Sequence, residues 1–283
     1  MPFLFNRVII VGVGLIGSSM GMNFLQKRLA HEVIGVGRNK KNLKEAVRRK
    51  AITHSVGVPC IETLLGDLTK DDLVILATPV EGIVRYLEKA KSKALFTDVG
   101  STKTSMIAAA KKSGVRFIGS HPIAGTERTG AAAGDINLFK GRLCLVTPLS
   151  HSADVLKIKK LWKALGSQVI LMDAKKHDHL LSVVSHLPHV AAYGLMQAVG
   201  QLISLPHESR FAFGGLKDTT RIAASSPEIW RDIFISNSKN VVHGIDQFLK
   251  ELIKIKAYLV KKDSKGLFEY LKKSQRLRLM MRS

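Results

Sequence analysis

The sequence predicts an α/β fold in which a doubly wound, mostly parallel sheet is followed by an all-α domain. Three observations lead to this prediction. A strand-like apolar run near the start enters a glycine-rich turn and then a helical pattern, strand-like and helix-like segments alternate through the first half, and helical patterns dominate after Asp173. We therefore expect one domain at residues 1–172 and a second, helical domain at residues 173–283.

The first element is an apolar, β-branched run at residues 6–11, which suits a strand buried on both faces. A GxGxxG turn follows it and opens a helical pattern. In such a turn the first glycine permits a sharp bend, the second admits a pyrophosphate, and the third lets helix and strand pack closely. These features predict a Rossmann-type dinucleotide-binding domain. The expected cofactor contacts here are Gly12, Gly14, Leu15, Ile16 and Gly17.

The second strand-like run, residues 32–36, ends where such folds meet the adenosine ribose of the cofactor. An acidic residue at that point would favour NAD, but the chain has Gly37 and Arg38, with Lys40 and Lys41 close behind. Cations there suit a 2′-phosphate, so the sequence favours NADP over NAD. The alternative is that they are solvated turn charges on a basic protein.

Further buried strands are expected in the first half of the chain, with a helix between the last two. The strands are predicted at residues 72–77, 94–98, 116–118, 143–147 and 168–172, and the helix at residues 153–165. Ligands of such sheets gather beyond the carboxyl ends of the strands. Polar and turn residues at these ends are therefore candidates for the site. Thr78 and Pro79 are expected cofactor contacts, and Ser101 and His121 are candidate catalytic residues.

The second domain is expected to consist of long helices. One is predicted at residues 177–202 with an interruption or kink at Pro188, and another at residues 227–256 with a capped start at Ser226. A basic helix follows from Ser264. Because these helices carry much apolar surface, we expect a homodimer formed through the helical domain.

The 283-residue chain is strongly basic, with a formal net charge of +22. This charge could steer anionic ligands or hold a polyanion weakly, but no nucleic-acid recognition motif accompanies it, so a solvated lysine-rich surface is favoured. No apolar run reaches the ~18 residues of a membrane span. Few residues precede the first strand, and Cys60 and Cys144 lack disulfide or metal spacing. A cytoplasmic protein without a membrane segment or specific nucleic-acid partner is expected.

His121 is the candidate catalytic residue. It follows a predicted strand, precedes the rigid Pro122, and is close to the flexible Gly125. An imidazole placed there could accept the proton of a substrate hydroxyl while hydride leaves the same carbon, and Ser101 could share that hydrogen bond. A histidine with only a structural role is the alternative.

Four motifs occur in a fixed order along the chain, and together they are specific for one family of enzymes. They are DVGSTK at residues 98–103, GSHPIAGTE at residues 119–127, SHLPH at residues 185–189 and FGGLKDTTRIA at residues 213–223. Over residues 8–256 this series resembles the prephenate and arogenate dehydrogenases of tyrosine biosynthesis. The resemblance implies oxidative decarboxylation of a cyclohexadienyl substrate to 4-hydroxyphenylpyruvate or tyrosine, with hydride transfer to NAD(P). Whether the substrate is prephenate or arogenate stays open, because Glu127 could favour an ammonium group or act as a gate.

The resemblance also implies roles for individual residues. His121 matches the catalytic histidine that bonds the ring hydroxyl, and Ser101 matches a serine that orients the same group. Arg221 matches the arginine that binds a substrate carboxylate, and His189 matches a histidine of the substrate pocket. The remaining matches line, gate or brace that pocket, and they are Thr126, Glu127, Asp218 and Trp230.

The sequence allows three other interpretations. A β-hydroxyacid-type dehydrogenase would need a catalytic lysine in the second domain, for which Lys217 is a weak candidate. The second interpretation is a non-catalytic nucleotide- or polyanion-binding protein, which the positive charge suggests but no motif supports. A metal site on the histidines of the second domain is disfavoured, because Pro188 disturbs their register and no supporting motif accompanies them. These histidines are His177, His179, His186 and His189.

Overall fold

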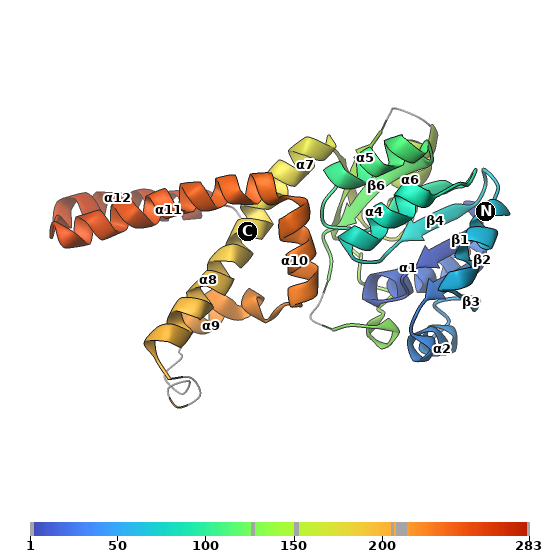
Figure 1. The fold of residues 1–283 in the computed structure, drawn as a ribbon, viewed down its shortest axis with the longest axis horizontal. Coiled ribbons are helices and arrows are strands. Elements are labelled where there is room, and N and C mark those ends of the chain that lie inside the picture. Colours follow the sequence, from blue (N-terminus) through green and yellow to red (C-terminus); the bar gives the residue numbers. More distant parts are fainter. Residues whose placement is uncertain (1–2, 126–127, 150–152, 205–206, 208–213, 282–283) are drawn as a thin grey trace. The chain divides into compact units, whose positions relative to one another are not determined.

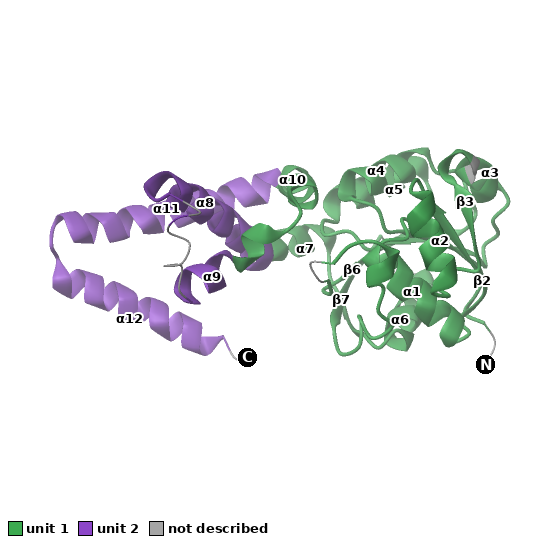
Figure 2. Cartoon of the chain, turned by 90° about the horizontal axis from the view of Figure 1, so that it is seen from below, with its two compact units in different colours: residues 1–181, 221–237 green, residues 182–220, 238–283 purple. Residues whose placement is uncertain are grey.

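A computed structural model describes residues 3–125, 128–149, 153–204, 207 and 214–281 of the chain. The chain divides into two compact units, shown in green and purple in Figure 2. The first unit comprises Met1–Leu181 and Arg221–Asn237, and the second comprises Ser182–Thr220 and Ser238–Ser283. The chain therefore returns once to the first unit before it completes the second.

The first unit is built on one eight-stranded sheet with the order β3-β2-β1-β4-β5-β6-β7-β8. All neighbouring strands are parallel except β6 and β7, which pair antiparallel. This arrangement confirms the predicted fold class. The strands are β1 Phe5–Val11, β2 Ala30–Gly37, β3 His54–Gly57, β4 Leu73–Leu76, β5 Leu95–Asp98, β6 Arg116–Pro122, β7 Leu143–Pro148 and β8 Gln168–Leu171.

Helices cover both faces of the sheet (Figure 1). Alternate residues of β1 show why: Val8 and Ile10 belong to the apolar cluster on one face, and Ile9 and Val11 to the cluster on the other. The first cluster takes in α1 Leu15–Gln26, α2 Lys40–Arg48 and α6 Ala153–Ala164, and the second takes in α3 Ile61–Gly66, α4 Val80–Lys89 and α5 Thr104–Ser113. A strand buried on both faces explains the unbroken apolar run in the sequence.

The first unit also contains two later helices, α7 Ala174–Leu181 and α10 Pro227–Ser236. Ser226 caps α10 by accepting a hydrogen bond from the Ile229 backbone, as predicted. The prediction of one continuous helix at residues 227–256 is wrong, because the helix is interrupted at Asn237. The buried Asn237 side chain donates to the Asp178 carbonyl at 2.8 Å, a tertiary bond that a continued helix pattern did not reveal.

The second unit consists of helices. A π-helical turn, η3 Ser182–His186, leads into α8 Leu187–Leu202, and the unit continues with α9 Gly214–Thr220, α11 Ser238–Val260 and α12 Ser264–Met280. The π turn comes just before Pro188, which lacks a backbone N–H, so the predicted interruption of the helix is present. Helices α11 and α12 lie side by side, and the Tyr270 hydroxyl donates to Glu251 at 3.0 Å. Within the described residues no helix has the length and apolar character needed to cross a membrane.

Candidate active site

The glycine turn between β1 and α1 has the geometry that a dinucleotide requires. Gly12 has φ of +98°, and a Cβ there would lie 2.5 Å from the Ala77 carbonyl oxygen. A Cβ on Gly17 would overlap the Gly12 carbonyl, whereas Gly14 has open space around its Cβ position and caps the N-terminus of α1. The predicted contacts Leu15 and Ile16 begin that helix. The turn therefore leaves room for an anionic pyrophosphate at the positive end of α1.

Asn42 of α2 ties this turn to the rest of the unit. Its side-chain amide donates to the Val13 carbonyl at 2.5 Å, and its oxygen accepts from the Ala131 backbone at 2.6 Å. The segment after Ala131 is also bonded to α1, where the Ser19 hydroxyl accepts from the Asp135 backbone at 2.9 Å. Asn42 thus bonds the glycine turn to the segment around Ala131, and Ser19 bonds α1 to the same segment. The sequence pattern identifies neither side chain.

Thr78 and Pro79 follow β4 at the same edge of the sheet, as predicted. The Thr78 hydroxyl is buried and has no hydrogen-bond partner among the described residues, and the Thr78 methyl is 3.1 Å from the Cβ position of Gly12. Pro79 is the exposed N-cap residue of α4. A buried hydroxyl without a partner beside the glycine turn fits a bound ligand that supplies one.

At the end of β2, Gly37 is followed by the exposed Arg38 and by Asn39, which caps α2 by accepting from the Asn42 backbone at 3.0 Å. Lys40 and Lys41 form the first turn of α2 and are exposed. Three cations therefore lie at or beside a helix N-terminus, with no carboxylate at the end of β2. This is an arrangement that suits a phosphate group.

His121 lies within a strand, which corrects the expectation that the strand ends at Ile118. Strand β6 continues to Pro122 because its antiparallel partner β7 extends the pairing, with Ser120 opposite Val146 and His121 opposite Leu145. The apolar run in the sequence ends at Ile118 and gives no sign of this pairing. The backbone of His121 is therefore held on one side by its pairing with β7, and its imidazole is half-buried.

A line of hydrogen bonds runs from His121 into the interior of the first unit. His121 Nδ1 is 3.0 Å from Nε2 of His177, and His177 Nδ1 is 2.9 Å from the Asp178 carboxylate. The same carboxylate accepts from the backbone N–H groups of Lys103 and Thr104, each at 2.8 Å. His177 is 0% exposed and Asp178 2% exposed.

The surroundings keep His177 neutral and Asp178 ionised. Burial lowers the pKa of His177, although Asp178 opposes that change, so His177 is neutral at neutral pH. For Asp178, burial alone would raise the pKa, but hydrogen bonds from His177, Thr104 and Lys103 bring the pKa below its ordinary value. A neutral imidazole and an ionised carboxylate therefore lie behind His121.

The loop that carries Ser101 rests on a second buried group. The Asp98 carboxylate contacts the Lys103 ammonium and also accepts from the backbone N–H groups of Gly100 at 2.7 Å and Ser120 at 3.0 Å. Burial raises the pKa of Asp98, while Lys103 and the two backbone groups oppose the rise. These contacts join the loop after β5 to β6 and hold the half-buried Ser101 at the carboxyl edge of the sheet, the same edge as His121.

The predicted substrate residues occur in both units. Arg221 is exposed at the start of the turn Arg221–Ala224, and Trp230 lies on α10 with its ring centroid 5.3 Å from that of Phe234; both belong to the first unit. His189 on α8 and the exposed Asp218 on α9 belong to the second unit. His189 Nδ1 is 2.9 Å from the Ser185 carbonyl oxygen. Thr126 and Glu127 lie outside the described residues.

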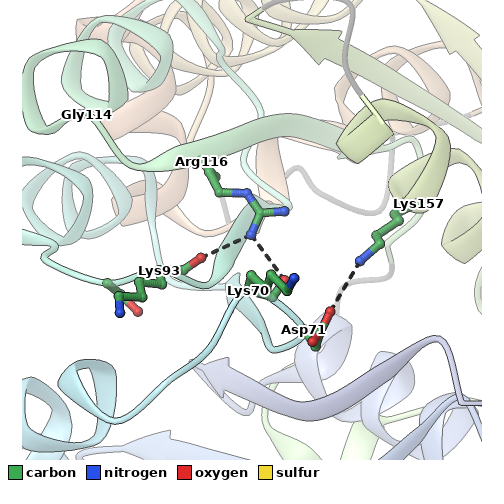
Figure 3. Close-up of a pocket in the computed structure, with 7 residues that line it drawn as sticks. Lys70, Asp71, Lys93, Gly114, Arg116 and Lys157 are labelled. Carbon is green, nitrogen blue, oxygen red and sulfur yellow. Dashed lines mark hydrogen bonds and ion pairs between the residues drawn. The ribbon is translucent and has the colours of Figure 1, made fainter.

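A basic hollow lies at the opposite, amino edge of the sheet, where the loops before β4, β5 and β6 meet (Figure 3). Arg116 organises it by donating to the carbonyls of Lys70 and Lys93 and by pairing with Asp154 at 2.6 Å. None of the predicted site residues that the structure describes lines this hollow. Within the described part of the chain, no group of three or more histidine, cysteine, aspartate or glutamate side chains is placed to hold a metal ion.

Sequence reasoning missed three side chains that support the site. These side chains are His177, Asp178 and Lys103, and all three are buried. The sequence alone indicates His177 only as a disfavoured metal ligand and indicates no role for the other two. A histidine–aspartate dipeptide at the start of a helical region, and a lysine in an otherwise buried motif, were the available signals. Neither signal identifies a partner 56 or 75 residues away in the sequence.

Comparisons with known proteins match nearly the whole chain. The family model for the nucleotide-binding domain of prephenate dehydrogenase matches residues 22–171, and the model for its dimerization domain matches residues 173–273. A prephenate dehydrogenase of Bacillus subtilis (strain 168) is 31% identical over 278 residues, which cover 94% of this chain and 74% of that protein. A cyclohexadienyl dehydrogenase of Zymomonas mobilis is 32% identical over 293 residues. This alignment covers 99% of this chain and 97% of that protein.

A solved structure shows the same likeness in three dimensions. The prephenate dehydrogenase of A. aeolicus, crystallised with hydroxyphenyl propionate and NAD+, superposes with a TM-score of 0.87 at 32% identity. The superposition covers 98% of this chain and 99% of that one.

Proposed function

The chain belongs to the prephenate dehydrogenase family, and from that premise we propose how its own residues carry out the reaction. It is an NAD(P)-dependent oxidoreductase with prephenate dehydrogenase function. We propose that its substrate is prephenate, arogenate or both, converted to 4-hydroxyphenylpyruvate or tyrosine. The bound nicotinamide supplies the hydride acceptor of this reaction.

In the proposed mechanism His121 accepts a hydrogen bond from the ring hydroxyl of the substrate, and Ser101 orients the same hydroxyl. As hydride leaves the hydroxyl-bearing carbon, the bond to the ring carboxylate breaks, carbon dioxide departs, and the electron pair of that bond completes the aromatic ring. Electron density must be drawn from one end of the ring and released at the other. The observation that carries this proposal is the position of His121 on β6, at the carboxyl edge that also bears the glycine turn.

We propose that Arg221 binds a carboxylate of the substrate, because a guanidinium can bond both carboxylate oxygens. His189 would contact the same substrate, while Asp218 and Trp230 would brace the arginine and the pocket wall. Thr126 and Glu127 would line or gate the pocket. These roles are supported by the matching motifs of the family and by the exposure of Arg221 in the first unit.

We propose NADP as the preferred cofactor over NAD. The proposal is supported by the exposed Arg38, Lys40 and Lys41 after β2 and by Gly37 in place of an acidic residue. The open space at Gly14 fits a dinucleotide of either kind, as does the buried Thr78 hydroxyl, which has no partner in the described part of the chain. The cations and the lack of an acidic residue at position 37 are the features that distinguish the two.

We further propose that the domain boundary lies at residues 172–173, where the matches to the two family models meet, although the compact first unit extends to Leu181. We also propose that the enzyme is a cytoplasmic homodimer. The match to a dimerization domain supports the dimer, as do the apolar side chains that α11 exposes, among them Leu249, Leu252 and Ile253. Light scattering of the purified protein tests the dimer, and cell fractionation tests the location.

The decisive experiment follows formation of the reduced cofactor by absorbance, with prephenate and arogenate each assayed with NADP and with NAD. The mechanism predicts turnover of at least one of the two substrates, and the cofactor proposal predicts a higher kcat/KM with NADP. An absence of turnover in all four combinations would refute the proposed function.

A further inference from the structure

The histidine pair at the edge of the sheet defines which nitrogen of His121 carries the hydrogen. The Asp178 carboxylate is ionised and already accepts two backbone N–H groups, so it can only accept from His177. Hydrogen therefore resides on Nδ1 of His177. Because His177 is neutral, its Nε2 has a lone pair and no hydrogen.

That lone pair determines the state of the next ring. His177 Nε2 is 3.0 Å from His121 Nδ1, and a lone pair at that distance needs a donor. His121 must then carry its hydrogen on Nδ1, which leaves the lone pair on Nε2. A neutral imidazole in this tautomer is a hydrogen-bond acceptor at Nε2, and the opposite tautomer would present a donor there.

We propose that His177 and Asp178 are positioning residues that hold His121 in the Nδ1–H tautomer, so that its Nε2 accepts the hydrogen bond of the substrate hydroxyl. This inference rests on the proposed function of His121. The two residues do not touch substrate in this account and act only through His121. In many enzymes a carboxylate orients a catalytic imidazole directly. Here a second imidazole, that of His177, lies between the carboxylate of Asp178 and His121.

The carboxylate at the end of this line is well fixed. Its two oxygens accept from consecutive backbone N–H groups of Lys103 and Thr104, and the Asp178 carbonyl accepts from the Asn237 side chain at 2.8 Å. Among the described residues, the other charged groups that act on His177 are Asp98 and Lys103, which also pair with each other. A positive charge that develops on His121 during the reaction would therefore be balanced through His177 by Asp178.

The direct test is nitrogen NMR of the full-length protein labelled with 15N-histidine at neutral pH, with and without NADP. The two rings are assigned from the signals lost in His121→Gln and His177→Gln. The inference predicts hydrogen on Nδ1 and a bare Nε2 in both residues. An Nε2–H tautomer at His121, or an equal mixture of tautomers, would overturn it.

Kinetic variants separate positioning from a purely structural effect. His177→Phe keeps a ring but removes the acceptor for His121 Nδ1, so kcat should fall about 10-fold to 100-fold with KM little changed. His177→Gln retains an amide oxygen that can accept from His121, and it should recover part of the loss. His179→Gln is the matched control, because it changes an exposed histidine on the same helix and should retain wild-type kcat.

Each outcome has one meaning. Equal kcat for wild type and His177→Phe, or equal losses in the Phe and Gln variants, would contradict the positioning role. A wild-type protein that shows the expected tautomers but turns over neither prephenate nor arogenate would refute the proposed function and leave the tautomer assignment intact.

Discussion

The ammonium of Lys103 contacts the carboxylate of Asp98 at the end of β5, and both side chains are 0% exposed. The two residues flank the loop that carries Ser101, which lies between the end of β5 and the start of α5. Lys103 also donates its backbone N–H to Asp178, so one residue joins the sheet to the line of hydrogen bonds behind His121. The pair therefore connects the stability of the fold with the geometry of the site.

Replacing one member of this pair should be costly. Lys103→Met leaves Asp98 buried without its counter-charge, and we expect the free energy of unfolding to fall by about 3–5 kcal/mol. Urea unfolding followed by circular dichroism measures the change. Lys111→Met, on the exposed side of α5, is the control and should change it little. Similar midpoints for the two variants would contradict the importance assigned to the pair.

His177 should make the fold sensitive to mild acid. Its pKa in the folded protein is below the unfolded value of 6.5, because burial disfavours the charged ring. Below that pH the unfolded chain binds a proton that the folded chain resists, so the stability that is present above pH 6.5 is lost as the pH falls through the lower, folded pKa. A pH series of urea unfolding curves should show this loss, and His177→Gln should reduce its slope. The same slope in both proteins would disprove the assignment.

His121→Gln should remove most of the turnover and have little effect on substrate binding. We expect kcat to fall about 10²-fold to 10⁴-fold, because general acid–base assistance to the hydroxyl is lost, while KM changes little. Steady-state kinetics with the better substrate measures both constants. His54→Gln, an exposed histidine on β3, should behave as wild type. A variant with raised KM and normal kcat would assign His121 to binding instead.

Arg221→Ala should have the complementary effect. Loss of a charge-assisted bond to the substrate carboxylate should raise KM about 10-fold to 100-fold with a smaller effect on kcat. Arg221→Lys should restore only part of the affinity, because an ammonium cannot bond both carboxylate oxygens at once. Arg85→Ala removes an exposed arginine of α4 and is expected to leave KM unchanged. An unchanged KM in Arg221→Ala would remove this residue from the site.

Cofactor choice should respond to the residues after β2. Arg38→Ala should lower kcat/KM for NADP at least about tenfold and leave the value for NAD nearly unchanged, because only NADP has the 2′-phosphate. Gly37→Asp should shift preference towards NAD by offering a carboxylate to the ribose. Lys44→Ala, farther along α2, is the control for a general change in charge. Equal losses with both cofactors would show that Arg38 does not read the phosphate.

The sequence predicted the fold where the pattern is local. The apolar run at residues 6–11, the GxGxxG turn and the capped start at Ser226 each specify their structure from neighbouring residues. The errors occur where a distant partner decides. Strand β6 is longer than its apolar run because β7 pairs with it, and the helix after Pro227 ends at Asn237 because that side chain bonds to Asp178.

The same distinction applies to the site. His121 and the glycine turn were identified from motifs, because their chemistry is visible in the residue types themselves. His177 was not, since its importance comes from a hydrogen bond to a residue 56 positions earlier. Hydrogen-bond partners brought together by folding leave no periodic signal in a single sequence.

The pairing of β6 with β7 makes His121 part of the sheet and not part of a loop. Its backbone is preorganised before any ligand arrives, so no binding energy has to be diverted into ordering it. Anyone who transplants this chemistry into another scaffold must therefore move both strands together with α7 as one block. A graft of the motif around His121 alone would transfer the imidazole but not β7 and α7, which hold its backbone and its ring in position.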